Sequence, residues 1–324
     1  MKDTKIFLFF VALITCFTWI FYETIRYVDE RDLTVSRENV SLENKIKHTI
    51  PDFFEVQSND EDETELRILF KTVLQEDAEM FSIYLYRPEL DEDPIIYNHA
   101  SPMRPASMIK VFVLAKVMDD AHNQKLSLDE KVMIDDQNVV GGAGVVNNYD
   151  PKIPVSIREL AEVMITESDN TATNILIDKV GGLDAMNQYC VEHGYFDTKF
   201  NHKMMMQNRY SGSNSTSVID LGTLFTRLYK YECVSLELDS LMIDFLTRLK
   251  DRECFPSALP DWKIAHKTGE IDELYDDGGI FYSDERGNFI LVIMNDQYSS
   301  RSATIQRMRR IAKIIATNYM TRLK

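Results

Sequence analysis

The hydrophobic pattern divides the chain into three parts, and the first is an apolar segment at the amino terminus. Residues 6–22 are almost entirely apolar or aromatic, and Lys2 and Lys5 precede them. As a helix, this run would be about 26 Å long, close to the thickness of a bilayer's hydrocarbon core. No small-residue cleavage site follows it. The pattern predicts that residues 1–24 are a retained signal anchor that crosses the cell membrane once, with the remainder of the chain outside the cytoplasm.

The second part, residues 25–62, is charged and lacks the regular apolar spacing of a folded core, and its most acidic stretch covers residues 58–63. Such a composition is typical of a solvated segment, so we expect a stalk. The third part, residues 63–324, is long enough for one large domain with a substantial core.

Within residues 63–324, helical spacing and strand alternation of the apolar positions occur in separate blocks. The predicted helices are residues 66–74, 107–118, 157–165, 171–177 and 305–323, and the predicted strands are residues 81–86, 262–269, 279–282 and 289–294. This order predicts an α+β fold. We expect an antiparallel sheet flanked by the terminal helices, plus a helical subdomain, with a cleft between them.

Charge and cysteine content narrow the possible partners. The formal net charge of -16 argues against nucleic acid as a partner. With Cys16 in the apolar segment, the odd number of remaining cysteines gives no disulfide framework, and both a Cys233–Cys254 pair and free thiols stay open. The six histidines are scattered without ligand spacing, so we expect neither a metal nor another cofactor. We expect a monomer.

The first motif with chemical meaning is Ser107-Met108-Ile109-Lys110, at the start of a predicted buried helix. Residues three apart share a helix face, so the Lys110 amine can lie within reach of the Ser107 hydroxyl. A serine hydroxyl needs a base to become a nucleophile, and a lysine held neutral by burial or by neighbouring cations can act as one. Taken alone, the motif also fits a helix cap followed by a solvated lysine.

The second motif, Ser168-Asp169-Asn170, lies on a predicted turn between two helices. We expect Asp169 to brace this turn, because aspartate side chains commonly accept hydrogen bonds from nearby backbone amides. The third motif, Lys267-Thr268-Gly269, lies on a predicted strand that begins a meander. We expect the preceding His266 to be a packing residue of that strand.

Together and in this order, the three motifs resemble those of the penicillin-recognising serine hydrolases, and they are most similar to the class A β-lactamase branch. The resemblance covers roughly residues 63–324 and implies the sheet and cleft described above. Residues 135–144 resemble the family's loop beside the cleft, and the stretch around Asp277 resembles a segment whose acidic residue braces the sheet. The implied substrates are β-lactams or D-alanyl peptide ends.

The resemblance also implies a role for each motif residue. Ser107 would attack the carbonyl carbon with Lys110 as its base, and Ser168 would relay a proton to the leaving group. Asn170 would bind the acyl amide of the substrate. The implied binding and oxyanion residues are Lys267 and Thr268 for a substrate carboxylate, Gly269 for close approach of the backbone to substrate, and the backbone amides of Ser107 and Glu270 for the oxyanion.

One departure from the family pattern affects the second half of the reaction. About thirty-five residues after the second motif, class A β-lactamases have a glutamate that activates the hydrolytic water, whereas residues 200–212 here contain no acid. Glu192 and Glu167 are poorly placed to substitute for it. Gln207 or Asn208 could orient a water but could not accept its proton. We expect residues 204–206, three methionines, to plug this loop against the core.

We therefore expect acylation to be intact and deacylation to be slow or impaired. Two alternatives remain open from the sequence. The chain could be a membrane-anchored D,D-peptidase of cell-wall metabolism without β-lactamase activity, or a penicillin-binding module that does not turn over.

Overall fold

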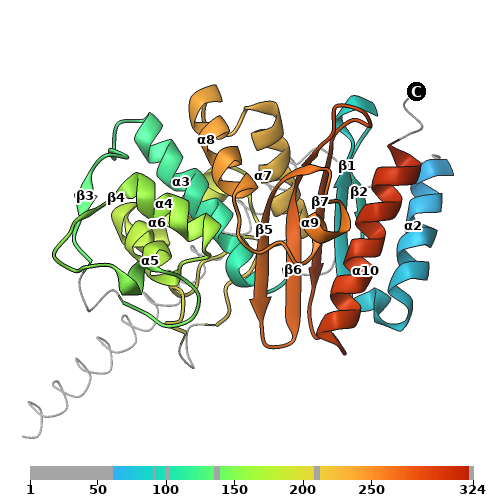
Figure 1. Ribbon diagram of the computed structural model, residues 1–324, viewed down its shortest axis with the longest axis horizontal. Helices are drawn as coiled ribbons and strands as arrows, with labels where there is room; N and C mark the ends of the chain where they lie inside the picture. The colour runs from blue at the N-terminus through green and yellow to red at the C-terminus, as the bar shows by residue number, and fades with distance from the viewer. Residues whose placement is uncertain (1–60, 91, 99–101, 135–138, 208–211, 321–324) are drawn as a thin grey trace, which may run out of the picture. The chain divides into compact units, whose positions relative to one another are not determined.

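The computed structural model describes residues 61–324 except positions 91, 99–101, 135–138, 208–211 and 321–324 (Figure 1). The predicted anchor and nearly all of the predicted stalk lie outside the described residues. Glu61–Lys324 form one compact unit. In the part of the chain that the structure describes, no helix is both long and apolar enough to span a membrane.

A five-stranded antiparallel sheet runs through the centre of this unit, with the strand order β2-β1-β7-β6-β5. The strands are β1 (Phe81–Tyr86), β2 (Ile95–Tyr97), β5 (Lys263–Ile271), β6 (Leu274–Tyr282) and β7 (Phe289–Asn295). The central strands β6 and β7 are almost wholly buried, because helices cover both faces of the sheet. A two-stranded sheet, β3 (Lys131–Val132) with β4 (Val155–Ser156), lies in the helical part.

The terminal helices cover one face of the sheet. Figure 1 shows α2 (Glu61–Leu74) and α10 (Arg301–Ile314) side by side against it. Their apolar residues share one buried cluster with the sheet and the short helix α9 (Phe255–Ala258); the cluster includes Leu66, Phe70, Phe281, Phe289 and Ile311.

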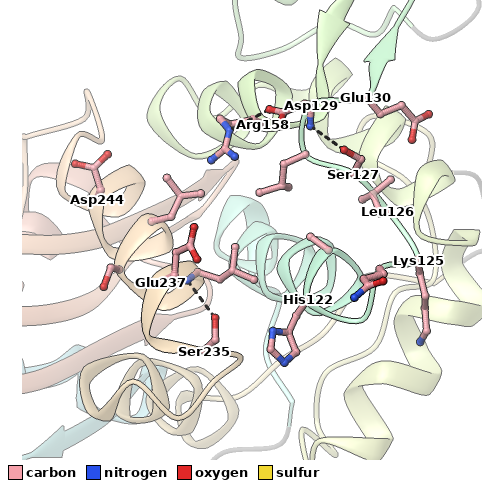
Figure 2. Close-up of a pocket in the computed structure, with 16 residues that line it drawn as sticks. His122, Lys125, Leu126, Ser127, Asp129, Glu130, Arg158, Ser235, Glu237 and Asp244 are labelled. Carbon is pink, nitrogen blue, oxygen red and sulfur yellow. Dashed lines mark hydrogen bonds and ion pairs between the residues drawn. The ribbon is translucent and has the colours of Figure 1, made fainter.

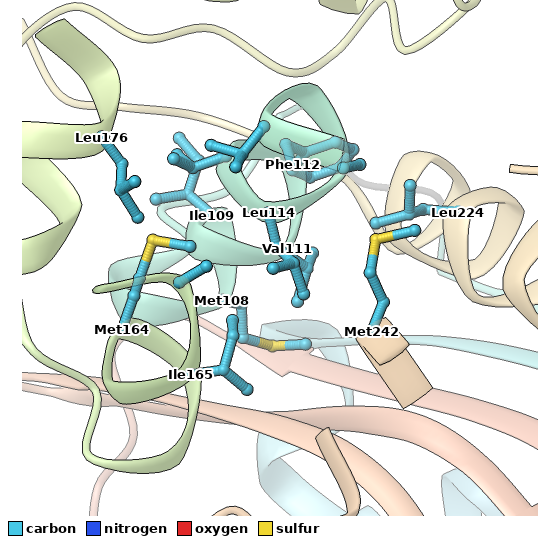
Figure 3. Close-up of a cluster of buried hydrophobic side chains, with 14 of the residues drawn as sticks. Met108, Ile109, Val111, Phe112, Leu114, Met164, Ile165, Leu176, Leu224 and Met242 are labelled. Atoms are coloured by element: carbon cyan, nitrogen blue, oxygen red, sulfur yellow. The ribbon is translucent and has the colours of Figure 1, made fainter. Parts of the chain in front are cut away.

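The helical subdomain lies on the other side of the sheet. Its helices are α3 (Lys110–His122), α4 (Ile157–Thr166), α5 (Asn170–Lys179), α6 (Gly182–Glu192), α7 (Val218–Lys230) and α8 (Leu236–Thr247). Figure 3 shows α3 at the centre of a second apolar cluster, where Met108, Phe112, Met164 and Met242 are fully buried. Burying α3 on all sides explains why its sequence is apolar rather than amphipathic.

The predicted α+β fold, with its antiparallel sheet, flanking terminal helices and helical subdomain, is confirmed. Element boundaries differ in several places. The strand predicted at residues 279–282 begins at Leu274, because Asp276 and Asp277 are buried strand residues despite their charge. The last helix begins at Arg301 and changes to a π-helix at Ile315–Tyr319. The thiols of Cys190, Cys233 and Cys254 are free, so the Cys233–Cys254 pair does not form.

Candidate active site

Ser107 lies in a tight turn that leads into α3 rather than in the α-helix itself. The turn is the 3-10 segment η3 (Ala106–Ile109), and α3 begins at Lys110. The residue before the serine, Ala106, has a φ of 42°, a left-handed conformation that a side chain resists. Met108 N donates to Pro105 O over 2.9 Å within the turn. Such local strain is frequent at functional sites and persists only where the surroundings enforce it.

Gly269 on β5 packs against the turn that contains Ser107. A Cβ built on Gly269 would lie 2.5 Å from Pro105 O and 3.1 Å from Met108 Cγ. The glycine therefore lets β5 pack directly against the turn that carries Ser107. The space that the missing side chain leaves is filled by the protein itself, and close approach of a substrate at Gly269 stays a prediction.

Lys110 is fully buried and is held by the second motif. Its Nζ donates to Ser168 O over 2.5 Å and to Asn170 Oδ1 over 2.8 Å, and lies 3.3 Å from Ser168 Oγ. Burial, reinforced by the charge of Lys267 and opposed by that of Asp169, lowers the pKa of Lys110 well below its ordinary value. Among the described residues, no hydrogen bond joins Lys110 to Ser107.

Ser168 lies between the two motif lysines. Its Oγ is 3.3 Å from Lys110 Nζ and accepts from Lys267 Nζ over 3.1 Å. Its φ of 53° is again left-handed. The structure thus brings Ser168, Lys110 and Lys267 together, although Ser168 is 58 positions from Lys110 and 99 positions from Lys267 in the sequence.

Asp169 enforces the unusual turn around Ser168. Its carboxylate accepts from Ala172 N over 2.8 Å, which caps α5, and from Val145 N and Val146 N over 2.6 and 2.8 Å. The expectation that Asp169 braces the turn is confirmed. It does more than predicted, because it also fixes the neighbouring loop.

Asn170 makes its side-chain hydrogen bonds to the protein. Besides accepting from Lys110, its amide donates to Gly141 O over 3.0 Å, and its backbone N donates to Ala143 O over 3.0 Å. These contacts place part of the predicted cleft-side loop against the second motif; residues 135–138 of that loop lie outside the described residues. In this geometry, Asn170 orients Lys110.

Lys267 and Thr268 are both buried on β5. Lys267 Nζ donates to Thr268 O over 2.8 Å in addition to Ser168 Oγ. Burial lowers the pKa of Lys267 to about 8, while the carboxylates of Asp251 and Asp277 oppose this shift. The two carboxylates thus favour the charged form of Lys267.

Glu270 follows the third motif, and its side chain is directed away from the motif residues into an ion pair. Arg301 Nε, at the start of α10, donates to Glu270 Oε1 over 2.5 Å, and Arg301 also donates to Glu253 over 2.7 Å. This exposed network ties the end of β5 to α10. The oxyanion role of the Glu270 backbone amide stays a prediction.

The loop after the second motif is anchored by Asn174, one turn of α5 beyond Asn170. Asn174 Oδ1 accepts from Met204 N over 2.8 Å, and Asn174 Nδ2 donates to Met204 O over 3.0 Å. The expected methionine plug holds for Met204, which is 8% exposed, but Met205 and Met206 are 64% and 51% exposed. The expectation for Met205 and Met206 is wrong, because both side chains are largely exposed; Met205 Sδ would lie 3.3 Å from a Cβ built on Gly142 of the neighbouring loop.

The possible substitute acids have other partners. Glu167 forms an ion pair with Lys250, and Glu192 accepts from Gln188 Nε2 over 2.7 Å. Gln207 Nε2 lies 3.3 Å from Gly212 O, within its own loop. Asn208 lies outside the described residues. None of these contacts supplies a carboxylate to Lys110 or Ser168.

A cavity of about 910 Å³ lies away from the motif residues (Figure 2). The ends of α3 and α4, the loop between α3 and β3, and α8 line it, with His122, Arg158 and Glu237 among the polar residues. None of the motif residues lines this cavity. No sequence motif indicated this cavity, because the residues that line it come from segments far apart in the sequence.

A buried pair behind Lys267 was also not indicated by the sequence. His266 and Asp277, expected as separate packing and bracing residues, form a 2.8 Å hydrogen bond between Nδ1 and Oδ1. The strand register could have suggested it, since His266 pairs with Gly279 and Asp277 with Thr268, which makes His266 and Asp277 diagonal neighbours.

Comparison with known proteins agrees with the motifs and the fold. A model of the beta-lactamase enzyme family matches residues 65–319. The chain is 29% identical over 180 residues to Beta-lactamase BRO-1 of Moraxella catarrhalis, which covers 52% of this chain and 55% of the relative. It is 27% identical over 206 residues to a beta-lactamase of Streptomyces fradiae, covering 60% and 66%. The matched region thus spans between half and two thirds of these curated relatives.

Solved structures show the same fold. PBP-A has a TM-score of 0.72 at 24% identity, covering 79% of this chain and 96% of PBP-A. A mutant of PBP-A, solved as an acyl-enzyme complex with penicillin G, has the same TM-score at 25% identity and covers the same shares. The TLA-3 extended-spectrum beta-lactamase has a TM-score of 0.73 at 18% identity, covering 80% and 99%.

Proposed function

Because the chain belongs to the beta-lactamase enzyme family, we propose that it is a serine hydrolase that forms an acyl-enzyme on Ser107. Its substrates are β-lactams or D-alanyl peptide bonds. The observation that carries the proposal is Lys110, a fully buried amine with a strongly lowered pKa, three residues after Ser107. A neutral amine at this position is the base that a serine nucleophile needs.

In the proposed acylation, Ser107 Oγ attacks the carbonyl carbon and its proton passes to Lys110. The backbone amides of Ser107 and Glu270 stabilise the oxyanion. Ser168, hydrogen-bonded to Lys267 and 3.3 Å from Lys110, passes a proton from Lys110 to the leaving nitrogen. Lys267 and Thr268 bind a substrate carboxylate, with the charge of Lys267 attracting it.

Deacylation of the resulting ester is slow in this account. It requires a base on a water, and the loop that includes Met204 has no acid in residues 200–212. Asn174 fixes Met204, a residue that cannot take a proton, in that loop. The enzyme therefore accumulates as the acyl-enzyme with β-lactams.

The acid-free loop also favours a second candidate, a D,D-peptidase without β-lactamase activity. Both functions acylate Ser107: with a D-alanyl peptide the terminal D-alanine leaves as the ester forms, whereas the nitrogen of an opened β-lactam stays attached to the acyl group. Turnover of a D-alanyl-D-alanine peptide without nitrocefin turnover would select the peptidase. A penicillin adduct with no turnover of either substrate would leave a penicillin-binding module.

The proposed location is the outer face of the cell membrane, with residues 1–24 as the anchor and residues 25–62 as the stalk. The apolar run at residues 6–22 and the lysines before it support this proposal. The acidic net charge supports partners other than nucleic acid, and the domain would act as a monomer.

Acylation is tested with fluorescent penicillin on the full chain and on Ser107→Ala. The wild-type protein should acquire a covalent label that survives denaturation, and Ser107→Ala should acquire none. Equal labelling of the two proteins, or no labelling of either with penicillin or a fluorophosphonate, would overturn the proposed function.

A further inference from the structure

His266 and Asp277 form a buried pair directly behind the site. The side chains are 1% and 0% exposed, and Asp277 Oδ1 lies 2.8 Å from His266 Nδ1. The second carboxylate oxygen of Asp277 accepts from Phe255 N over 3.3 Å. With the proton on His266 Nδ1, both oxygens have donors, an arrangement that favours a negative charge on Asp277 against the cost of its burial.

Lys267 needs such a charge. It is fully buried, and in the described part of the chain its hydrogen bonds go to Ser168 Oγ and Thr268 O, which are both neutral groups. No salt bridge joins it to a described carboxylate. A buried ammonium without a counter-charge is strongly disfavoured, so more distant carboxylates must stabilise it.

The charges around Lys267 come from several elements. Asp277 on β6 and Asp251, in the segment before α9, favour its charged form, whereas Lys110 on α3 is a like charge. Of the three acids of α8, which packs on β5, Glu237 lines the cavity of Figure 2 and the other two have partners of their own. Asp239 accepts from backbone amides at Cys233 and Val234, and Asp244 pairs with Arg248.

The charge of Asp277 depends in turn on the histidine. Burial raises the pKa of Asp277, and the interaction with His266 lowers it. The Cys254 thiol also lies near this carboxylate, but burial raises the pKa of Cys254 well above its ordinary value, so the thiol stays neutral. The charge of Asp251 also raises the pKa of Asp277 and the hydrogen bond from Phe255 N lowers it, but the interaction with His266 is the largest of the effects that lower it.

We propose that His266 and Asp277 are a positioning pair that keeps Lys267 charged against Ser168. The pair touches no substrate and acts through Lys267, and its catalytic consequence rests on the proposed function. The histidine stabilises the carboxylate of Asp277, that carboxylate stabilises the ammonium of Lys267, and the ammonium holds Ser168 Oγ and attracts a substrate carboxylate.

The sign of the effect follows from the charges. Removing the negative charge of Asp277 lowers the pKa of Lys267 further below about 8, so Lys267 loses its proton at a lower pH. Removing the His266 donor raises the pKa of Asp277, which weakens the same stabilisation. Both changes should move the alkaline limit of acylation to lower pH.

The test compares Asp277→Asn, His266→Leu and His266→Asn with wild type in the full chain. The pKa of Lys267 is followed by NMR of ¹³C-labelled lysine, with the signal assigned by its loss in Lys267→Arg. Asp277→Asn and His266→Leu should lower this pKa by about one unit, the scale of one nearby opposite charge. His266→Asn keeps an N–H donor, so its Lys267 pKa should lie closer to the wild-type value than to that of His266→Leu.

Asp276→Asn is the matched control. Asp276 is the neighbouring buried carboxyl on β6, but it is absent from the charges that act on Lys267. Asp276→Asn removes a buried acid from β6, as Asp277→Asn does, but it should leave the pKa of Lys267 unchanged. Thermal unfolding of each variant identifies any that fail to fold.

The second readout is the pH dependence of penicillin acylation. Asp277→Asn should lower the pH of the alkaline midpoint by the same amount as the titration. An unchanged Lys267 titration in both Asp277→Asn and His266→Leu, with both variants folded, would overturn the positioning pair. Absence of acylation in wild type would instead overturn the proposed function, because the NMR titration needs no activity.

Discussion

At the scale of single residues, the surroundings of the Lys110 amine determine whether it can act as a base. Its amine is buried, and a like charge, that of Lys267, contacts the same Ser168 Oγ. Two cations near one hydroxyl oppose each other's charge, so one of them loses its proton more easily. Two carboxylates, Asp251 and Asp277, favour the charged form of Lys267, whereas Lys267 itself disfavours the charge on Lys110, so Lys110 is the one suited to be a base.

Replacing Lys110 tests this division of roles. Lys110→Ala should slow penicillin acylation by about 10²- to 10⁴-fold, the usual contribution of a positioned base. Lys110→Arg should be equally slow, because a guanidinium stays protonated and cannot accept the serine proton. The measurement is the second-order rate constant for acylation.

Lys116 provides the control, since it is a second buried lysine of α3 and is paired with Asp120 over 2.6 Å. Lys116→Ala should reduce stability but leave the acylation rate of the folded protein within a few-fold of wild type. Near-normal acylation by Lys110→Arg would contradict the role of Lys110 as base.

The sequence predicted the motif residues but only part of their surroundings. The approach of Lys110 to Ser107 stays a prediction, whereas the bracing role of Asp169 could be predicted because one amide that it caps lies three residues further on. The link between His266 and Asp277 could not, because it depends on the register of a hairpin. The left-handed Ala106 was equally hidden, since it belongs to a turn that packs against β5, a strand far away in the sequence.

At the scale of elements, the site depends on how α5 begins. Asp169 caps the helix and binds two amides of the neighbouring loop, so Ser168 and Asn170 are held by one carboxylate. Asp169→Ala should lower the free energy of unfolding by about 2–4 kcal/mol, because it removes a cap and leaves two further amides without a partner. Acylation should fall strongly as well.

Ser156→Ala is the comparison for this prediction. Ser156 caps α4 in the ordinary way, accepting from Glu159 N over 3.2 Å. Its removal should cost about 1 kcal/mol of stability and leave acylation almost unchanged. If denaturant unfolding and acylation respond alike in Asp169→Ala and Ser156→Ala, the special role of the α5 cap is refuted.

A second prediction concerns Met204, whose backbone is hydrogen-bonded to the side chain of Asn174. Asn174 and Asn170 lie on one face of α5, and Asn170 contacts Lys110, so position 204 lies close to the site. Met204→Glu should supply the missing base and speed deacylation of the penicilloyl ester by about 10²-fold. The rate is measured as recovery of free enzyme after acylation.

Met206→Glu is the control for that change. Met206 belongs to the same loop but is 51% exposed, so a carboxylate there remains in solvent. Its deacylation rate should equal that of wild type. Identical rates in Met204→Glu and wild type, with the variant folded, would argue against this loop as the place of the missing base.

Among the elements, the strands of the meander and the terminal helices were predicted, whereas α7 and α8 were not and element ends were predicted less well. The sheet and the terminal helices follow from strong patterns. The start of β6 was missed because Asp276 and Asp277 are charged residues that the fold buries. The exposure of Met205 was missed because burial of one methionine in a loop does not extend to its neighbours.

At the scale of the whole molecule, we expect the hydrolase domain to be tethered to a membrane by residues 1–24. Expressed in a bacterium, the full chain should sediment with membranes and require detergent for extraction, whereas a variant without residues 1–24 should be soluble. A variant that lacks residues 25–60 but keeps residues 1–24 should remain with the membrane. Full-length protein in the soluble fraction would contradict the anchor.

The most direct test of the central claim is intact-protein mass spectrometry after a short exposure to penicillin and removal of the excess. We predict a mass increase of one intact penicillin on Ser107, absent in Ser107→Ala, that persists through a long chase. An adduct that never forms on Ser107 would contradict the acylation half. Rapid return to the unmodified mass would contradict impaired deacylation and would require another group to activate the water.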